Sequence, residues 1–140
     1  MKERNGMSQY GIELQAYKEQ AINTMTSGEM LILLYDEIVK RLKKAKILAN
    51  NSAYDNFDNE ITRAKEIVTY LNNALDRKFD ISSQLTRLYN FFHYQMARII
   101  ASRNLELIDE LIPLIEDLRD TYKEADRLSK MKGQPYAANG

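Results

Sequence analysis

The interior of this chain is almost free of the two residues that interrupt helices. Of its five glycines and two prolines, only Gly28 and Pro113 lie between residues 12 and 132. Glycine and proline are the residues least favourable inside a helix. Apolar residues recur along this interior at steps of three and four, the spacing that puts side chains on one helix face. The sequence therefore predicts helices, and no segment alternates with the period of two that is typical of a half-buried strand.

Four apolar stripes predict four helices. The first is expected to begin near Ser27 and to run to about Asn50. The second is expected to end near Arg77, and Asp80 can cap the third, because an aspartate side chain accepts hydrogen bonds from the free N–H groups of a first turn. The fourth stripe extends to about Leu128.

Short links between consecutive helices force neighbours to run antiparallel. We therefore predict an all-α fold, an antiparallel up-down-up-down four-helix bundle with an N-terminal segment packed on it. The expected domain plan is a leader and groove cap over residues 1–26, the bundle over residues 27–128 and a flexible tail over residues 129–140. Pro113 falls inside the fourth helix, where the loss of one backbone hydrogen bond predicts a kink.

The segment before the first helix carries a start signal and unaccompanied apolar residues. Thr26 and Glu29 have the spacing of a capping box, in which each side chain accepts from the other residue's backbone N–H. Ahead of them, Tyr17 and Ile22 lie in a segment too short and polar to form its own core. We therefore expect both side chains to pack on the body of the same protein.

Several predicted helices carry a second apolar row beside the core stripe, including Leu107 and Leu114 on the fourth. One bundle core cannot cover every such row, and exposed apolar strips usually mark a partner surface. The pattern leaves open a second interpretation, in which the helices are broad-faced and their tyrosine hydroxyls lie in water. The candidate partner-binding residues are Tyr17, Ile22, Tyr35, Ile67, Tyr70, Ala74, Phe91 and Tyr94.

No motif in the sequence favours catalysis or a cofactor. The chain has no cysteine, and His93 is its single histidine, with Asn90 instead of a carboxylate three residues earlier. Paired Glu-x-x-His motifs of di-iron bundles and zinc-ligand spacings are therefore absent. Gly28 stands alone, so there is no glycine-rich phosphate loop. We expect no catalytic residue, no metal, no cofactor and no enzymatic activity.

Charge and hydropathy restrict the partners. Twenty basic and twenty acidic residues cancel, and no basic cluster is present, which argues against nucleic acid. The longest apolar run covers residues 30–35, far below the roughly 20 residues that span a bilayer, so no stable membrane insertion is expected. We interpret the protein as soluble and cytoplasmic.

Three short motifs follow one another along the predicted helices. The first comprises Ala16, Tyr17, Ile22, Asn23, Thr24, Thr26, Gly28, Glu29, Leu34, Tyr35 and Asp36; the second Asp80, Ile81, Ser82, Leu85, Leu88 and Tyr89; the third Leu118, Arg119, Asp120, Thr121 and Tyr122. In this order on a four-helix pattern, they resemble the FliS family of flagellar export chaperones over about residues 14–125. The chain departs from that family at Ser27, where proline is frequent, at Tyr122, where tryptophan is common, and at Pro113.

The resemblance implies a cytoplasmic bundle that binds the disordered C-terminal segment of flagellin. It implies that the chaperone prevents premature polymerisation and delivers flagellin to a component of the flagellar type III export gate. It also implies a leader that covers the groove until flagellin arrives, which agrees with Tyr17 and Ile22 as a gate. The alternative is a structural or regulatory bundle that self-associates through the same strips, so a monomer and a weak homo-oligomer both remain open.

Overall fold

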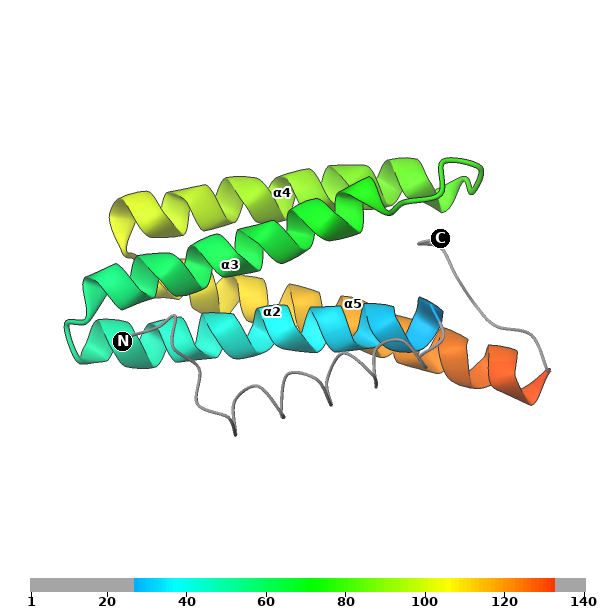
Figure 1. The fold of residues 1–140 in the computed structure, drawn as a ribbon, viewed down its shortest axis with the longest axis horizontal. Coiled ribbons are helices and arrows are strands. Elements are labelled where there is room, and N and C mark those ends of the chain that lie inside the picture. The colour runs from blue at the N-terminus through cyan, green and yellow to red at the C-terminus, as the bar shows by residue number, and fades with distance from the viewer. Residues whose placement is uncertain (1–26, 133–140) are drawn as a thin grey trace, which may run out of the picture.

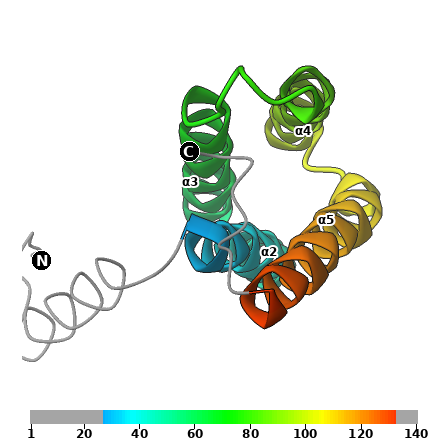
Figure 2. The ribbon, with the colours of Figure 1, turned by 90° about the vertical axis from the view of Figure 1, so that its right-hand side faces the viewer.

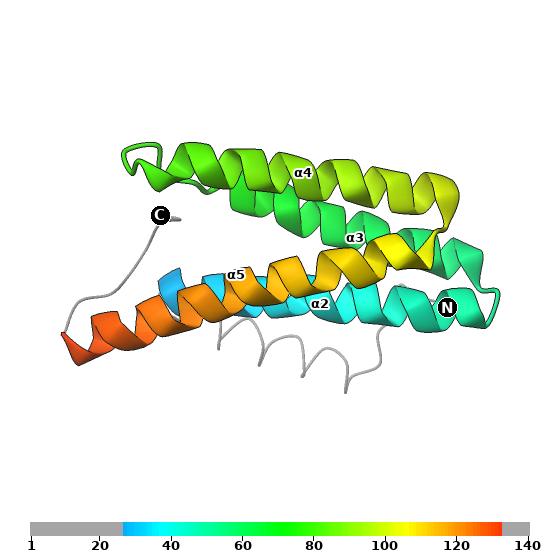
Figure 3. The ribbon, with the colours of Figure 1, turned by 180° about the vertical axis from the view of Figure 1, so that it is seen from behind.

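A computed structural model describes residues 27–132 of the chain. Over this range it consists of four helices and no strand: α2 (Ser27–Asn50), α3 (Tyr54–Asn73), α4 (Ile81–Ser102) and α5 (Leu105–Met131). Successive helices run in opposite directions (Figures 1 and 3) and follow one another in chain order around one core in the end-on view (Figure 2). Helix α2 packs against α3 and α5, and α4 packs against the same two helices. The predicted all-α, up-down-up-down bundle is confirmed.

One apolar face of each of the four helices contributes to a single core. Two tyrosines join them across the bundle, because the hydroxyls of Tyr35 on α2 and Tyr89 on α4 lie 2.6 Å apart and both side chains are fully buried. The Tyr35 ring also packs against the Tyr122 ring of α5. The largest fully buried side chains are Tyr35, Tyr89, Phe57, Phe92, Ile38, Leu42, Ile61, Leu71, Met96, Ile99, Ile108 and Leu111.

Helix boundaries agree with the sequence at α2 and differ at α3. Helix α2 begins at Ser27 and ends at Asn50, as predicted, whereas α3 ends at Asn73 and not near Arg77. After Asn73 the N–H of Leu75 bonds to the carbonyl of Asn72, a tighter turn than an α-helix allows. Leu75 is still buried, so the apolar stripe continues past the last helical residue. The stripe therefore overstated the length of this helix.

The helix starts also differ from the expectation. Asp80 precedes α4, but its backbone is already helical and its side chain makes no capping hydrogen bond, so the predicted capping role is wrong. The start of α5 uses Asn104 instead, whose side-chain oxygen accepts from the Glu106 N–H at 3.0 Å. Arg103, the residue that follows α4, has a left-handed conformation with φ 54°.

Helix α5 runs without interruption through Pro113 to Met131, three residues beyond the predicted end of the fourth helix. Proline has no N–H, so the carbonyl of Asp109 lacks its usual helical partner. Pro113 itself is exposed, while its neighbour Ile112 is buried. A kink at this position stays a prediction.

Ion pairs connect α2 to α5 along the seam between these two helices. They occur at several levels of the bundle, from the start of α2 almost to its end. The pairs are Glu29 with Lys130 at 2.7 Å, Asp36 with Arg119 at 2.9 Å, Lys43 with Glu116 at 3.6 Å, and Lys46 with Asp109.

Between residues 27 and 132, no helix combines the length and the apolar composition needed to cross a bilayer.

Candidate functional site

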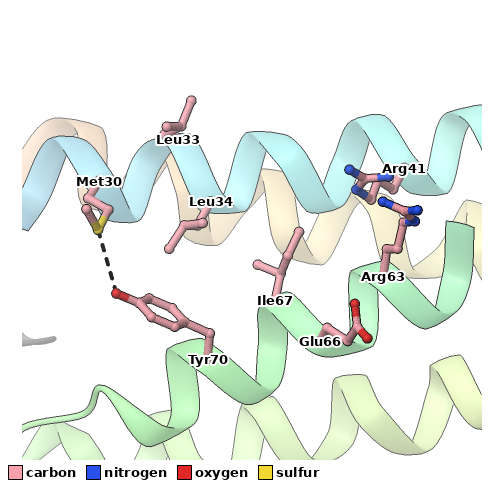
Figure 4. Close-up of a pocket in the computed structure, with 8 residues that line it drawn as sticks. All are labelled: Met30, Leu33, Leu34, Arg41, Arg63, Glu66, Ile67 and Tyr70. Atoms are coloured by element: carbon pink, nitrogen blue, oxygen red, sulfur yellow. Dashed lines mark hydrogen bonds between the residues drawn. The ribbon is translucent and has the colours of Figure 1, made fainter. Parts of the chain in front are cut away.

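An apolar groove lies between α2 and α3 (Figure 4). Its main part has a volume of about 390 Å³, and a smaller hollow of about 170 Å³ continues it toward the start of α2. The two parts share Met30, Leu34 and Tyr70, and we refer to them together as the α2–α3 groove. The main part is lined by Met30, Leu33, Leu34, Arg41, Arg63, Glu66, Ile67 and Tyr70, and the smaller one adds Ser27, Leu31, Leu71 and Ala74.

The groove is formed by the row of side chains next to the core stripe on each helix. Leu34 of α2 and Ile67 of α3 are half-buried against the core, so they form its apolar floor. Tyr70 is 53% exposed, and its hydroxyl lies 3.9 Å from the sulfur of Met30 across the groove (Figure 4). A thioether sulfur is a weak acceptor, so this contact can be displaced at little cost. The surface is therefore apolar and open.

The groove becomes polar at one end. In Figure 4, Arg41 of α2 and Arg63 of α3 lie at the end opposite Met30 and Tyr70. Arg41 pairs with Glu37 at 3.2 Å and with Glu60 at 2.9 Å. Past the two arginines the surface continues as a polar hollow of about 440 Å³ lined by Arg41, Lys44, Leu48, Asn56, Asn59, Glu60 and Arg63.

The structure brings three of the predicted residues together and separates another from them. Ile67, Tyr70 and Ala74 all line the α2–α3 groove. Tyr35 is corrected: it has no exposed surface, because it lies on the core side of α2 with its hydroxyl against Tyr89. Tyr35 is therefore a core residue of α2 and offers no surface to a partner.

Two of the sequence-based candidates and one cap lie outside the described residues. These are Tyr17 and Ile22, which were interpreted as a gate, and Thr26, which was expected to cap the first helix. The role of the leader therefore stays a prediction.

Phe91 and Tyr94 lie elsewhere on the bundle. Both are on α4 and are 40% and 62% exposed. The α3 side of α4 is marked by His93, whose Nε2 lies 3.2 Å from the hydroxyl of Thr69. Phe91 precedes His93 by two residues, which is about 200° around a helix, so it points away from α3. The apolar row of α4 is therefore a separate surface, and Tyr94 there lies under the guanidinium of Arg98.

The sequence interpretation missed Leu33, Arg41 and Arg63 as groove residues. A signal was present, since residues three or four apart lie on one helix face. Extending the row from Met30 along α2 reaches Arg41, and extending the row from Ile67 backward reaches Arg63. Both arginines are charged, so neither belongs to an apolar row.

The described residues contain no group of three or more His, Cys, Asp or Glu side chains that could hold a metal ion. The single histidine lies in the α3–α4 seam, where burial, followed by the charge of Lys65, lowers the pKa of His93 below its ordinary value. Its neighbour at hydrogen-bond distance is the hydroxyl of Thr69.

Comparison with known proteins identifies relatives among flagellar proteins. The model of the family described as "Flagellar protein FliS" matches residues 10–129. The chain is also similar to the Flagellar secretion chaperone FliS of Bacillus subtilis (strain 168), with 24% identity over 110 residues, which cover 79% of this chain and 83% of that protein. Because the family model matches most of its length, the chain belongs to the FliS family of flagellar proteins.

Proposed function

We propose that this protein is a non-enzymatic cytoplasmic chaperone that binds the disordered C-terminal segment of flagellin, prevents its premature polymerisation and delivers it to the flagellar type III export apparatus. Membership of the FliS family and the name of the Bacillus subtilis relative support a flagellar chaperone role. The observation that carries the binding step is the open α2–α3 groove, whose floor is formed by the partly buried Leu34 and Ile67.

The geometry of the groove suits an amphipathic helix. Its walls are two antiparallel helices, and a third helix can place apolar residues at steps of three and four onto Leu34, Ile67 and Tyr70. Burial of apolar surface contributes about 25 cal/mol per Å². A disordered segment loses conformational freedom when it folds on binding, so it needs a large apolar interface. We therefore include Phe91 and Tyr94 of α4 as a second contact for the same partner.

The leader over residues 1–26 is the proposed cap of the groove. Support comes from the position of Ser27, the first residue of α2, which lines the smaller hollow, so the leader is joined to α2 at this end of the groove. Tyr17 and Ile22 would then cover apolar side chains that the partner later contacts. The tail over residues 129–140 has no assigned role in this proposal, although α5 itself extends to Met131.

The test is a titration of the full chain with a peptide of the C-terminal segment of flagellin from the same organism. Circular dichroism and heat release are followed together. The proposal predicts saturable binding with more helix than the sum of the two free components. Absence of binding, together with a concentration-dependent oligomer, would favour the self-associating bundle instead.

Two sets of variants locate the site. Tyr70→Ala should weaken binding by about tenfold, since an aromatic side chain at a contact often contributes 1–2 kcal/mol. Tyr54→Ala is the matched control, because Tyr54 is 38% exposed at the other end of α3 and does not line the groove. The double change Tyr17→Ala with Ile22→Ala should raise client affinity by removing a competitor, and unchanged affinity would rule out the gate.

A further inference from the structure

The α2–α3 groove changes from apolar to charged where Arg41 and Arg63 meet. Their guanidinium groups point toward one another across the groove (Figure 4). Two like charges held in this way repel, and an anion between them removes the repulsion. Arginine suits such a site because its planar fork binds a carboxylate through two parallel hydrogen bonds.

The neighbouring acidic residues pair with Arg41 and leave Arg63 without a carboxylate partner within the described residues. Glu37 and Glu60 pair with Arg41, and Glu60 also pairs with Lys44. Glu66 lines the same part of the groove, yet no ion pair joins it to Arg63, and Arg63 makes none with any other residue of the range 27–132. In addition, the Nε–H of Arg41 is buried and has no hydrogen-bond partner in this range.

We propose that Arg63, together with Arg41, binds a side-chain carboxylate of the segment that occupies the α2–α3 groove, and that this contact fixes the direction of the segment. The inference rests on the proposed function and adds to it a recognition element. The occupant is an amphipathic helix whose apolar stripe covers Met30, Leu34 and Tyr70 and is followed by an aspartate or glutamate.

The spacing of the groove sets the position of that acid. Met30 and Arg41 are eleven residues apart on α2, which corresponds to about 16 Å along the helix axis. A helix lying alongside covers the same distance in about eleven residues. The acidic residue is therefore expected about three turns after the first apolar contact.

Two further features determine the direction of the bound helix and indicate which carboxylate it presents. The negative end of a helix dipole is its C-terminus, so the partner helix is favoured with its C-terminal end at the arginines, parallel to α2. The groove does not close there, since a polar hollow with Lys44, Asn56 and Asn59 continues beyond Arg63. A chain can therefore pass through, so the carboxylate is that of a side chain and not of the chain end.

The experiment compares Arg63→Gln with Lys123→Gln in the full chain, with the C-terminal flagellin peptide as the probe. Lys123 is an exposed residue of α5, away from both proposed contact surfaces, and it makes no ion pair or side-chain hydrogen bond within the described range. Both variants lose one positive charge. At about 50 mM salt, Arg63→Gln should weaken binding about fivefold and Lys123→Gln less than about twofold. The difference between them should shrink at about 500 mM salt, because salt screens exposed charges.

A double-mutant cycle tests the pairing itself. The acidic residue of the peptide that has the predicted spacing is changed to its amide, and this change should weaken binding to the wild-type chain but not to Arg63→Gln. A peptide with an amidated C-terminus should bind as the unmodified peptide does. Thermal unfolding of both variants should match the wild type, since neither Arg63 nor Lys123 is buried.

The outcomes separate the two proposals. If the wild-type chain binds the peptide but Arg63→Gln and Lys123→Gln bind equally well, the carboxylate site is overturned while the chaperone function stands. Independent effects of Arg63→Gln and the peptide amide, or a loss caused by C-terminal amidation, overturn the site in the same way. If the wild-type chain does not bind the peptide at all, both proposals fail.

Discussion

The hydroxyl pair of Tyr35 and Tyr89 provides a quantitative test of the core. These hydroxyls lie 2.6 Å apart, both side chains are 0% exposed, and they belong to α2 and α4. Changing Tyr35 to phenylalanine keeps the ring and removes this contact. Loss of a partner by a buried polar group costs about 1–3 kcal/mol, so we expect Tyr35→Phe to lower the free energy of unfolding by about 1–2 kcal/mol. For a domain of this size, this is a decrease in Tm of about 4 °C per kcal/mol.

The matching change at Tyr89 isolates the interaction energy. Tyr89→Phe alone should cost a similar amount, whereas the double variant should cost clearly less than the sum of the two, with a coupling of about 1 kcal/mol. The assay is urea unfolding followed by circular dichroism at about 222 nm, analysed by linear extrapolation. Tyr54→Phe is the control, because its ring is 38% exposed, and it should change stability by less than about 0.5 kcal/mol.

Two results would refute this reasoning. Additive costs in the double variant would mean that the two hydroxyls do not interact. A loss of peptide affinity in Tyr35→Phe without a loss of stability would place Tyr35 at the partner surface and not in the core. We expect the folded variant to bind the flagellin peptide within about twofold of the wild type, since Tyr35 has no exposed surface to offer.

Three further changes test the charges, the histidine and the proline. Asp36→Asn removes the 2.9 Å pair with Arg119, and because both side chains are partly exposed, the loss should stay below about 1 kcal/mol and shrink in about 0.5 M salt; a salt-independent loss would contradict this. Burial lowers the pKa of His93 in the folded chain, so as the pH falls through about 6.5 the unfolded chain takes up the proton first and stability decreases; His93→Gln should make this decrease shallower, as measured by urea midpoints between about pH 7 and 5. Pro113→Ala restores a helical N–H in α5 and should raise the urea midpoint by an amount equivalent to about 1–3 kcal/mol, and a lower midpoint would show that the proline is needed for packing.

The helices were predictable because their signal is local. A stripe such as that of α2 is set by the chain's own spacing, so its start at Ser27 and its end at Asn50 could be read from the sequence. The end of α3 could not, because Leu75 packs into the core from a turn and extends the apolar pattern beyond Asn73. Burial of a side chain and helical conformation of its backbone are separate properties, and the pattern records only the first.

The site was predictable in part, for a related reason. The row of Ile67, Tyr70 and Ala74 follows from the spacing within α3. The apolar pattern does not specify how each helix is rotated about its axis relative to its neighbours. Because of this rotation, His93 faces Thr69 while Phe91 points away from α3. Charged residues such as Arg63 were overlooked because their role depends on the residue opposite, which belongs to another helix.

The contacts of α2 with α5 and with α3 differ in charge, and this difference explains why a partner would bind on the α3 side of α2. Ion pairs at four levels join α2 to α5, so an apolar segment at that seam would have to separate charges and remove them from water. On the α3 side, the ion pairs of α2 are confined to Arg41 and Lys44 within the described residues, and the stretch from Ser27 to Leu34 offers apolar side chains. A helix with an apolar face therefore gains burial in the α2–α3 groove without breaking an ion pair. Because the charged residues come next along that groove, the same distribution that selects the groove also provides an asymmetry that can select the direction of the bound segment.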